Sequence, residues 1–129
     1  MSDRLRQRLA AFERTLDRLD EALAVDPAAP LALDGTIQRF EFAFELAWKT
    51  LKDALADEGI EARTPREALR EAYGAGWLHD EDAWLGMLRD RDASSHVYSE
   101  EVAREIYGRV RQNAGALRQA WAAVASRPD

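Results

Sequence analysis

Apolar residues recur at steps of four and three along the start of the chain, and this spacing restricts the fold more than any other feature. The stripe consists of Leu5, Leu9, Phe12, Leu16, Leu19 and Leu23. Steps of three and four place side chains on one side of an α-helix, so we expect a helix over residues 3–24 with a single apolar face. The following segment, VDPAAP, contains two prolines, which end the helix.

A second, longer helix is expected over residues 33–58, with Gly59 just past its end. One side of this helix carries Ile37, Phe40, Phe44, Trp48, Leu51 and Leu55. Phe42 and Leu46 lie on the opposite side, because Phe42 is rotated by roughly 160° from Phe44. A helix that is apolar on two sides has to bury both. We therefore expect Phe42 and Leu46 to contact another helix or, as a dimer interface, a second subunit.

Two shorter helices carry clear start signals. Thr64 suits the N-cap, Pro65 the first helical position and Glu67 the third, which together predict a helix that stops at the Gly74-Ala75-Gly76 segment. Asp80 is a second N-cap and begins a helix that fades in the segment RDRDASSH.

A fifth helix is expected after Ser99, whose hydroxyl can cap it. Its apolar stripe consists of Val102, Ile106, Val110, Leu117, Trp121 and Val124. No run of alternating β-branched residues predicts a strand. The expected fold is therefore all-α, an up-and-down antiparallel bundle of four to five helices, in a single domain over residues 1–129.

Composition excludes several classes of protein. The chain has no cysteine and two histidines, so neither disulfides nor a thiolate or histidine-rich metal site is expected, and we predict no cofactor. The net charge of −6 is unlike that of a broadly basic nucleic-acid binder, although it leaves room for a local basic site. No apolar run approaches the roughly 20 residues that span a membrane, and the charged N-terminus does not resemble a signal peptide. We expect a cytoplasmic protein.

Reactive side chains gather in one segment, residues 89–98, with the sequence RDRDASSHVY. We expect it in a connection between two helices, where it is exposed. Arg91 can hold a phosphate through two hydrogen bonds, and His96 can transfer a proton near neutral pH. Together they suffice for metal-free attack of an RNA 2′-hydroxyl on the adjacent phosphate. Tyr98 offers a hydroxyl for modification.

Purely structural roles for these residues remain open. Arg91 can neutralise the end of the fourth helix with Asp92 as its partner, and Tyr98 can pack its ring while hydrogen bonding its hydroxyl. Asp92 and Ser95 are the supporting residues of the candidate site. Ser95 beside His96 does not indicate a serine hydrolase, because no nucleophile elbow accompanies it.

Other charged positions give weaker signals. The segment HDED at residues 79–82 can contact a metal, although a solvated turn with an N-cap explains it better. Glu45 and Lys49 form an ordinary helix-stabilising pair. Glu41 lies close to the core stripe, and a half-buried carboxylate there needs a partner, for which an arginine is the obvious kind. No phosphate-binding glycine loop is present, so the chain is not expected to be a nucleotidyltransferase itself.

Three stretches resemble one protein family. They are QRFEFAFELAWKTLKDALADEGI, TPREALREAYGAGWL and WLGMLRDRDASSHVYSEEVAREIY, and the resemblance covers roughly residues 36–107 in register. They are similar to the nucleotidyltransferase substrate-binding proteins, which belong to the larger group of HEPN domains. The resemblance implies a HEPN-like helical bundle that forms a homodimer, and a minimal nucleotidyltransferase encoded nearby as its partner.

The same resemblance implies a site. Many HEPN proteins carry an Arg-x4-His motif that forms a metal-independent ribonuclease site at the dimer cleft, and Arg91 and His96 match its spacing. In the toxin–antitoxin branch the motif extends to Arg-x4-His-x-Tyr, and the nucleotidyltransferase antitoxin attaches AMP to the tyrosine. Tyr98 matches that position.

Two functions therefore remain as alternatives. In the first, the chain is an endoribonuclease toxin that acts on RNA and is silenced by AMPylation of Tyr98. In the second, the chain is a non-catalytic subunit that binds substrate for the nucleotidyltransferase, which the acidic net charge favours. A helical dimer with an unrelated role is a third reading, which the resemblance disfavours.

Overall fold

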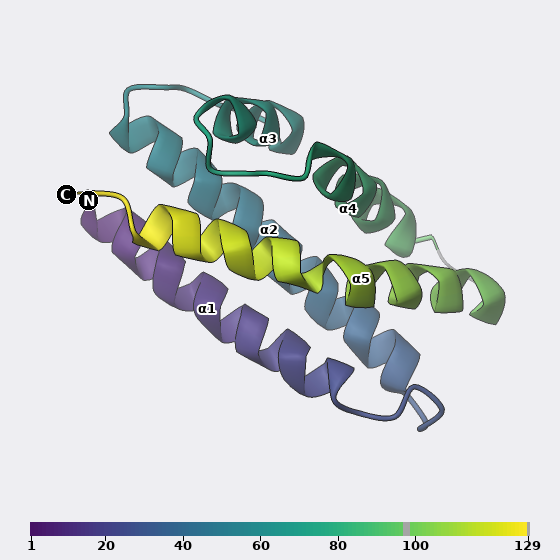
Figure 1. The fold of residues 1–129 in the computed structure, drawn as a ribbon. Coiled ribbons are helices and arrows are strands. Elements are labelled where there is room, and N and C mark those ends of the chain that lie inside the picture. Colours follow the sequence, from purple (N-terminus) through teal and green to yellow (C-terminus); the bar gives the residue numbers. More distant parts are fainter. Residues whose placement is uncertain (97–98, 129) are drawn as a thin grey trace.

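The computed structural model describes residues 1–96 and 99–128, and within them the α-helix is the only regular secondary structure (Figure 1). The five helices are α1 (Asp3–Leu23), α2 (Ala32–Asp57), α3 (Pro65–Gly74), α4 (Glu81–Ser94) and α5 (Glu100–Ala125). The described ranges contain no strand, and the predicted all-α fold is confirmed. No helix in these ranges is long and apolar enough to cross a membrane.

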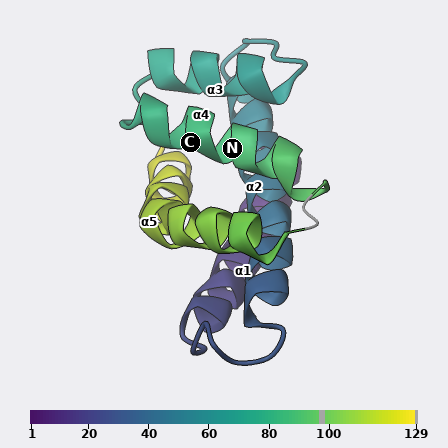
Figure 2. The same cartoon turned by 90° about the vertical axis from the view of Figure 1, so that its right-hand side faces the viewer.

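Helix α2 is the central element and contacts all four other helices. Helix α1 runs beside it, α5 crosses it, and the shorter α3 and α4 pack together at the opposite side from α1 (Figures 1 and 2). The two ends of the chain lie side by side, and the Ser2 backbone N–H donates a hydrogen bond of 3.1 Å to Asp57 at the end of α2.

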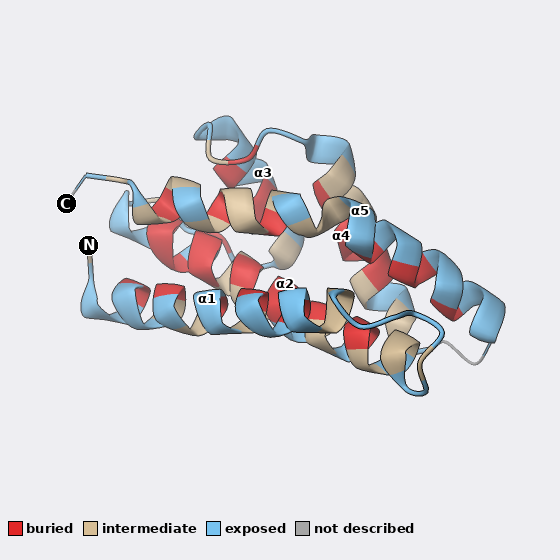
Figure 3. Cartoon of the chain, turned by 60° about the horizontal axis from the view of Figure 1, so that its bottom comes forward, coloured by how far each residue is buried: buried red, intermediate tan, exposed pale blue. Residues whose placement is uncertain are grey.

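The core is built from the predicted apolar stripes. Figure 3 shows the exposed residues along the outer side of α1, with buried residues of α2 and α5 turned towards the interior. The stripe of α1 is buried from Leu5 to Leu19. At the centre Phe44 packs with its ring centroid 6.2 Å from that of Trp84, which joins α4 to α2. The stripe of α5 is confirmed from Ile106 onward. Val102 is exposed, because the residue that faces the core at the start of α5 is Ala103, which is rotated by about 100° from Val102.

The start and stop signals act as predicted. The side chains of Thr64, Asp80 and Ser99 each accept a hydrogen bond from the backbone N–H three residues later. Gly59 follows α2 with a φ of +80°, a conformation that glycine adopts without strain. One detail differs from the predicted capping box, since the Glu67 carboxylate accepts from the backbone N–H of Arg63 and not from that of the N-cap.

The two residues on the second apolar side of α2 differ in their burial. Leu46 is partly buried and packs against the core of its own chain. Phe42 is 55% exposed, so this large apolar side chain is left mostly uncovered by the described residues. Packing within the chain therefore buries Leu46 in part but not Phe42. Contact of Phe42 with a second subunit stays a prediction.

Candidate functional site

The predicted reactive segment is mostly helical, which corrects the expectation of an exposed connection. Residues 89–94 form the last turns of α4, Ser95 is the C-cap, and His96 lies in the turn that follows. The helix extends this far because three of its last side chains have partners on other helices. Asp90 binds Arg109 of α5, while Arg91 and Ser94 bind glutamates of α2. Tyr98 lies outside the described residues.

Arg91 projects towards α2 and is held by two carboxylates. Its Nη2 donates to Glu45 Oε2 at 3.0 Å, and its Nη1 donates to Asp92 Oδ1 at 3.1 Å. About a third of each of the Arg91 and Glu45 side chains is exposed, so the pair is partly shielded from solvent. Glu45 also pairs with Lys49, at 3.3 Å between Oε1 and Nζ, as predicted. The guanidinium is therefore oriented at the surface and already neutralised by acids of its own chain.

The surroundings of Glu45 favour its ionised form. Partial burial opposes its ionisation, but the Trp48 indole dipole, Lys49 and the positive charge of Arg91 outweigh it, so its pKa lies below the usual range. The indole acts through its dipole, because Trp48 Nε1 forms no hydrogen bond with any atom of residues 1–96 and 99–128. Glu45 is thus a stable anion at neutral pH.

Glu41 has a different partner from the expected arginine. The Ser94 hydroxyl lies 3.0 Å from Glu41 Oε2 and also 3.0 Å from the carbonyl oxygen of Arg91, and it can donate to one of them at a time. Arg91, the arginine of this site, instead pairs with Glu45, which lies one helical turn further along α2. The spacing of Glu41 and Glu45 by four residues was visible in the sequence, but their pairing with the end of α4 was not.

Asp90 is the most buried charged group beside the site. It is 6% exposed, and Arg109 of α5 holds it through three hydrogen bonds of 3.0 to 3.1 Å from Nε and Nη2. These hydrogen bonds also keep the pKa of Arg109 above its ordinary value, against a smaller opposing effect of burial. The pair fixes α4 to α5 immediately before Arg91. Sequence reasoning assigned no role to Asp90 or Arg109.

The remaining predicted residues lie at the free end of α4. Asp92 pairs with Arg91, as in the purely structural alternative for these residues. His96 is exposed, and its backbone N–H donates to the carbonyl oxygen of Ala93 at 3.0 Å. Its imidazole makes no hydrogen bond or ion pair within the described part of the chain, so it is available to a ligand. Ser95 is exposed, and its backbone N–H donates to the carbonyl oxygen of Ala93.

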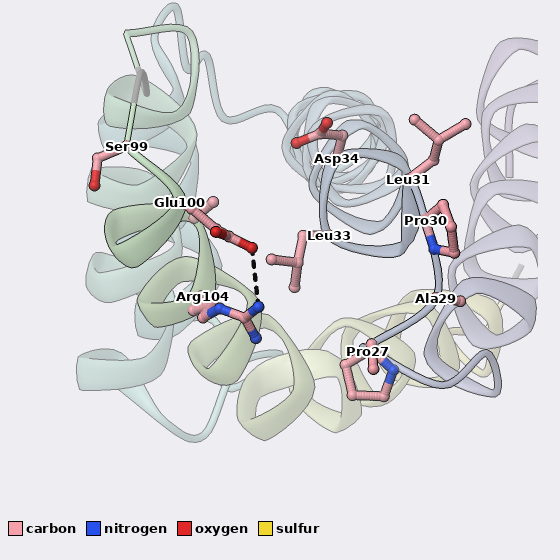
Figure 4. A pocket seen from close by; sticks show the side chains of 11 residues that line it. Pro27, Ala29, Pro30, Leu31, Leu33, Asp34, Ser99, Glu100 and Arg104 are labelled. Carbon is pink, nitrogen blue, oxygen red and sulfur yellow. Dashed lines mark hydrogen bonds and ion pairs between the residues drawn. The ribbon is translucent and has the colours of Figure 1, made fainter.

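Away from Arg91 and His96, the described residues form neither a metal-binding cluster nor a second candidate catalytic site. In residues 1–96 and 99–128 no group of three His, Asp or Glu side chains could hold a metal ion, and the Asp80 carboxylate is engaged as the N-cap of α4. A cavity of about 450 Å³ lies between the α1–α2 connection and the start of α5 (Figure 4). Its charged side chains include Asp34 and an internal pair, Arg104 with Glu100 at 2.9 Å. The Ser99 hydroxyl that lines this cavity is engaged as the N-cap of α5.

The fold and the site together define a helical-bundle protein with an arginine and a histidine at the end of its fourth helix. The chain belongs to the family described as nucleotidyltransferase substrate binding protein like, whose model matches residues 7–123. This confirms the family predicted from the three motif stretches, within the HEPN group.

Two relatives extend the comparison. The chain is 35% identical over 81 residues to the "Probable ribonuclease HepT" of Haemophilus influenzae, an alignment that covers 59% of this chain and 56% of that protein. It thus spans little more than half the length of this curated relative. A crystal structure of a protein from Thermus thermophilus has the same fold, with a TM-score of 0.83 and 35% identity over 90% of this chain and 99% of that one.

Proposed function

We propose that the chain is a metal-independent endoribonuclease that is controlled by a minimal nucleotidyltransferase. The observation that carries this proposal is the placement of Arg91 and His96. One is an oriented, partly exposed guanidinium in the last turn of α4, and the other an exposed imidazole in the next turn. The similarity to a probable ribonuclease supports it further.

Each residue has a defined task in this chemistry. The RNA 2′-oxygen bonds to the adjacent phosphorus while the bond to the 5′-oxygen breaks, which leaves a cyclic phosphate and a free 5′-hydroxyl. Arg91 stabilises the negative charge that grows on the phosphoryl oxygens. His96 either takes the proton from the 2′-hydroxyl or gives one to the departing 5′-oxygen. Because RNA must displace a carboxylate from Arg91, Glu45 and Asp92 compete with the substrate.

A homodimer completes this proposal. Phe42 lies on the same helix as Glu41 and Glu45 and is mostly exposed, so a second copy that covers it also comes close to the candidate site. Two protomers joined through this side of α2 bring two Arg91–His96 pairs to one cleft, and each imidazole can then serve either proton transfer.

Modification of Tyr98 is the proposed control. The tyrosine oxygen attacks the α-phosphorus of ATP, pyrophosphate leaves, and a phosphodiester with a negative charge remains on the tyrosine. Tyr98 is two residues from His96 in the sequence, so the added phosphate can compete with RNA for the Arg91 guanidinium. Tyr98→Phe keeps the ring and removes the acceptor oxygen. We expect this variant to stay active and to escape silencing.

A non-catalytic substrate-binding subunit is the second candidate function. The observation that favours it is the neutralisation of Arg91 by Glu45 and Asp92, in a chain with a net charge of −6. In this alternative the ion pairs are structural, and His96 is an incidental surface residue.

Expression in cells separates the two candidates. A ribonuclease arrests growth when expressed alone, and co-expression of the neighbouring nucleotidyltransferase relieves the arrest. Mass spectrometry should then find an AMP adduct on the peptide that contains Tyr98, and none on the Tyr98→Phe variant. Growth without arrest, together with a stable complex of unmodified chains, contradicts the ribonuclease and supports the binding subunit.

A further inference from the structure

A small cavity between α3 and α4 lies outside the candidate site and carries an unusual set of side chains. We call it the α3–α4 notch, and it is lined by Arg66, Arg70, Tyr73, Glu81, Trp84 and Leu85, among others. Its volume is about 210 Å³. This is smaller than the roughly 300–1,000 Å³ of cavities that enclose drug-sized ligands, so the notch suits a single ring system.

The two arginines of the notch are not held in ion pairs, although Arg70 also borders a hollow lined by Glu61, Glu67 and Glu71. Arg66 and Arg70 are both exposed, and neither forms an ion pair or a hydrogen bond with any described residue. They are four residues apart on α3 and therefore neighbours on one side of the helix, where like charges repel each other. Several other arginines of the chain are paired with acids, for example Arg63 with Glu61. Glu81 is the single acid among the residues that line the notch, so its charged side chains favour an anion.

The notch also presents aromatic surface. Tyr73 is 43% exposed, although its neighbours on α3 at Leu69 and Ala72 are buried. Trp84 lines the inner side, and its buried indole N–H has no acceptor in the described ranges. An exposed tyrosine ring beside arginines is the usual platform for a base of a single-stranded nucleic acid, since the ring stacks and the guanidinium groups hold the phosphate.

The position of the notch relates it to Arg91. Leu85 precedes Arg91 by six residues on α4, which corresponds to about 9 Å along the helix axis. Leu85 and Asp92 are seven residues apart, two helical turns, so they lie on one side of α4. Asp92 contacts the Arg91 guanidinium. A strand that follows this side of α4 from the notch therefore arrives at the candidate site.

We propose that the α3–α4 notch is an RNA subsite that holds one nucleotide outside the cleavage position. The base stacks on Tyr73 against the apolar wall at Leu85, and the phosphate lies between Arg66 and Arg70. The inference rests on the proposed ribonuclease function. A protein partner is disfavoured as the occupant, because the notch is too small for more than one side chain and its free charges are two phosphate-binding guanidiniums.

The test is binding of a fluorescently labelled, 2′-O-methylated single-stranded RNA, which lacks the attacking hydroxyl and cannot be cleaved. The double variant Arg66→Ala/Arg70→Ala is compared with Arg14→Ala/Arg18→Ala. The control pair has the same spacing on α1, is exposed and forms no side-chain ion pair among the described residues. We expect the notch variant to bind at least about fivefold more weakly. The plot of log affinity against log salt should flatten by about 0.7, the amount for one lost phosphate contact on a single strand. The control should match the wild type.

Tyr73 provides the second readout. Tyr73→Phe keeps the stacking ring and should bind like the wild type, whereas Tyr73→Ala should lose at least about fivefold in affinity. Circular dichroism of each variant should stay native-like, since the replaced side chains are exposed. Equal weakening by both arginine pairs, or full affinity of Tyr73→Ala, overturns the subsite.

Parallel cleavage of unmodified RNA separates this proposal from the function on which it rests. Cleavage by the wild type without an effect of the notch variants overturns the subsite alone. Binding that depends on the notch, without any cleavage, supports the subsite and contradicts the ribonuclease. A wild type that neither binds nor cleaves contradicts both. Loss of nucleotidyltransferase binding in the Arg66→Ala/Arg70→Ala variant, with RNA affinity unchanged, shows that the notch docks protein and overturns the proposal.

Discussion

Replacing Glu45 with glutamine tests the competition between carboxylate and RNA for Arg91. The substitution keeps the shape of the side chain and removes the charge that lies 3.0 Å from the guanidinium. Exposed ion pairs contribute about 0–1 kcal/mol, and breaking a fully buried pair costs about 3–5 kcal/mol. Because about a third of each side chain is exposed, we expect Glu45→Gln to lower the free energy of unfolding by about 1 kcal/mol.

The pH dependence of this effect has a definite sign. The pKa of Glu45 in the folded chain lies below its ordinary value of 4.5, so the native state favours the ionised form. Its contribution to stability is complete above that ordinary value and is lost as the pH falls through the lowered pKa of the folded state. Denaturant titrations should therefore show the full difference between wild type and Glu45→Gln at pH 7, and a shrinking difference below about pH 4.5.

RNA affinity should change in the opposite direction from stability. Without the carboxylate, Arg91 is freer to bind phosphate, so we expect uncleavable RNA to bind up to about fivefold more tightly, equivalent to about 1 kcal/mol. Glu21→Gln is the control, because Glu21 forms an exposed pair with Arg39 on another part of the chain. An affinity for RNA that falls in Glu45→Gln, or that rises equally in the control, refutes the competition.

Three further substitutions have clear expected outcomes. Arg109→Leu leaves the buried Asp90 carboxylate without its partner and should lower the free energy of unfolding by about 2 kcal/mol in chemical denaturation. This is less than for a fully buried pair, because Arg109 is half exposed, and a loss below about 0.5 kcal/mol contradicts the role of the pair. Phe42→Glu should weaken the proposed dimer with the helix content retained, and light scattering that finds a wild-type monomer at micromolar concentration rules the dimer out. Leu31 is 80% exposed with a φ of +68°, so Leu31→Asn should raise stability by about 1 kcal/mol, and thermal unfolding that shows no gain argues against backbone strain there.

The boundaries of the helices were predictable because the signals that set them are local. A cap needs one side chain and a backbone N–H three residues away, so Thr64, Asp80 and Ser99 could be recognised in the sequence. The stripe of α1 is equally local, since its spacing alone determines which side is apolar. The prediction failed at Val102, because its neighbour Ala103 faces the core at the start of α5 and Val102 lies at the edge of the buried stripe.

The candidate site was predictable in its residue types and not in its contacts. Residues 89–94 carry few apolar side chains, so their pattern indicated a fading helix. They are helical because Asp90, Arg91 and Ser94 meet side chains that are between 19 and 53 positions away in the sequence. No local pattern contains such distant pairs. Glu45 was interpreted only as the partner of Lys49 for the same reason.

Cleavage of RNA in the presence of EDTA tests the central proposal most directly. The purified wild-type chain should cleave single-stranded RNA at an unchanged rate when divalent metals are removed. His96→Ala should abolish cleavage, and Arg91→Ala should reduce it by at least about a hundredfold, the usual effect of losing a transition-state contact. Both variants should keep native-like circular dichroism. Cleavage that EDTA abolishes, or that His96→Ala leaves unchanged, contradicts the proposal that Arg91 and His96 form a metal-independent ribonuclease site.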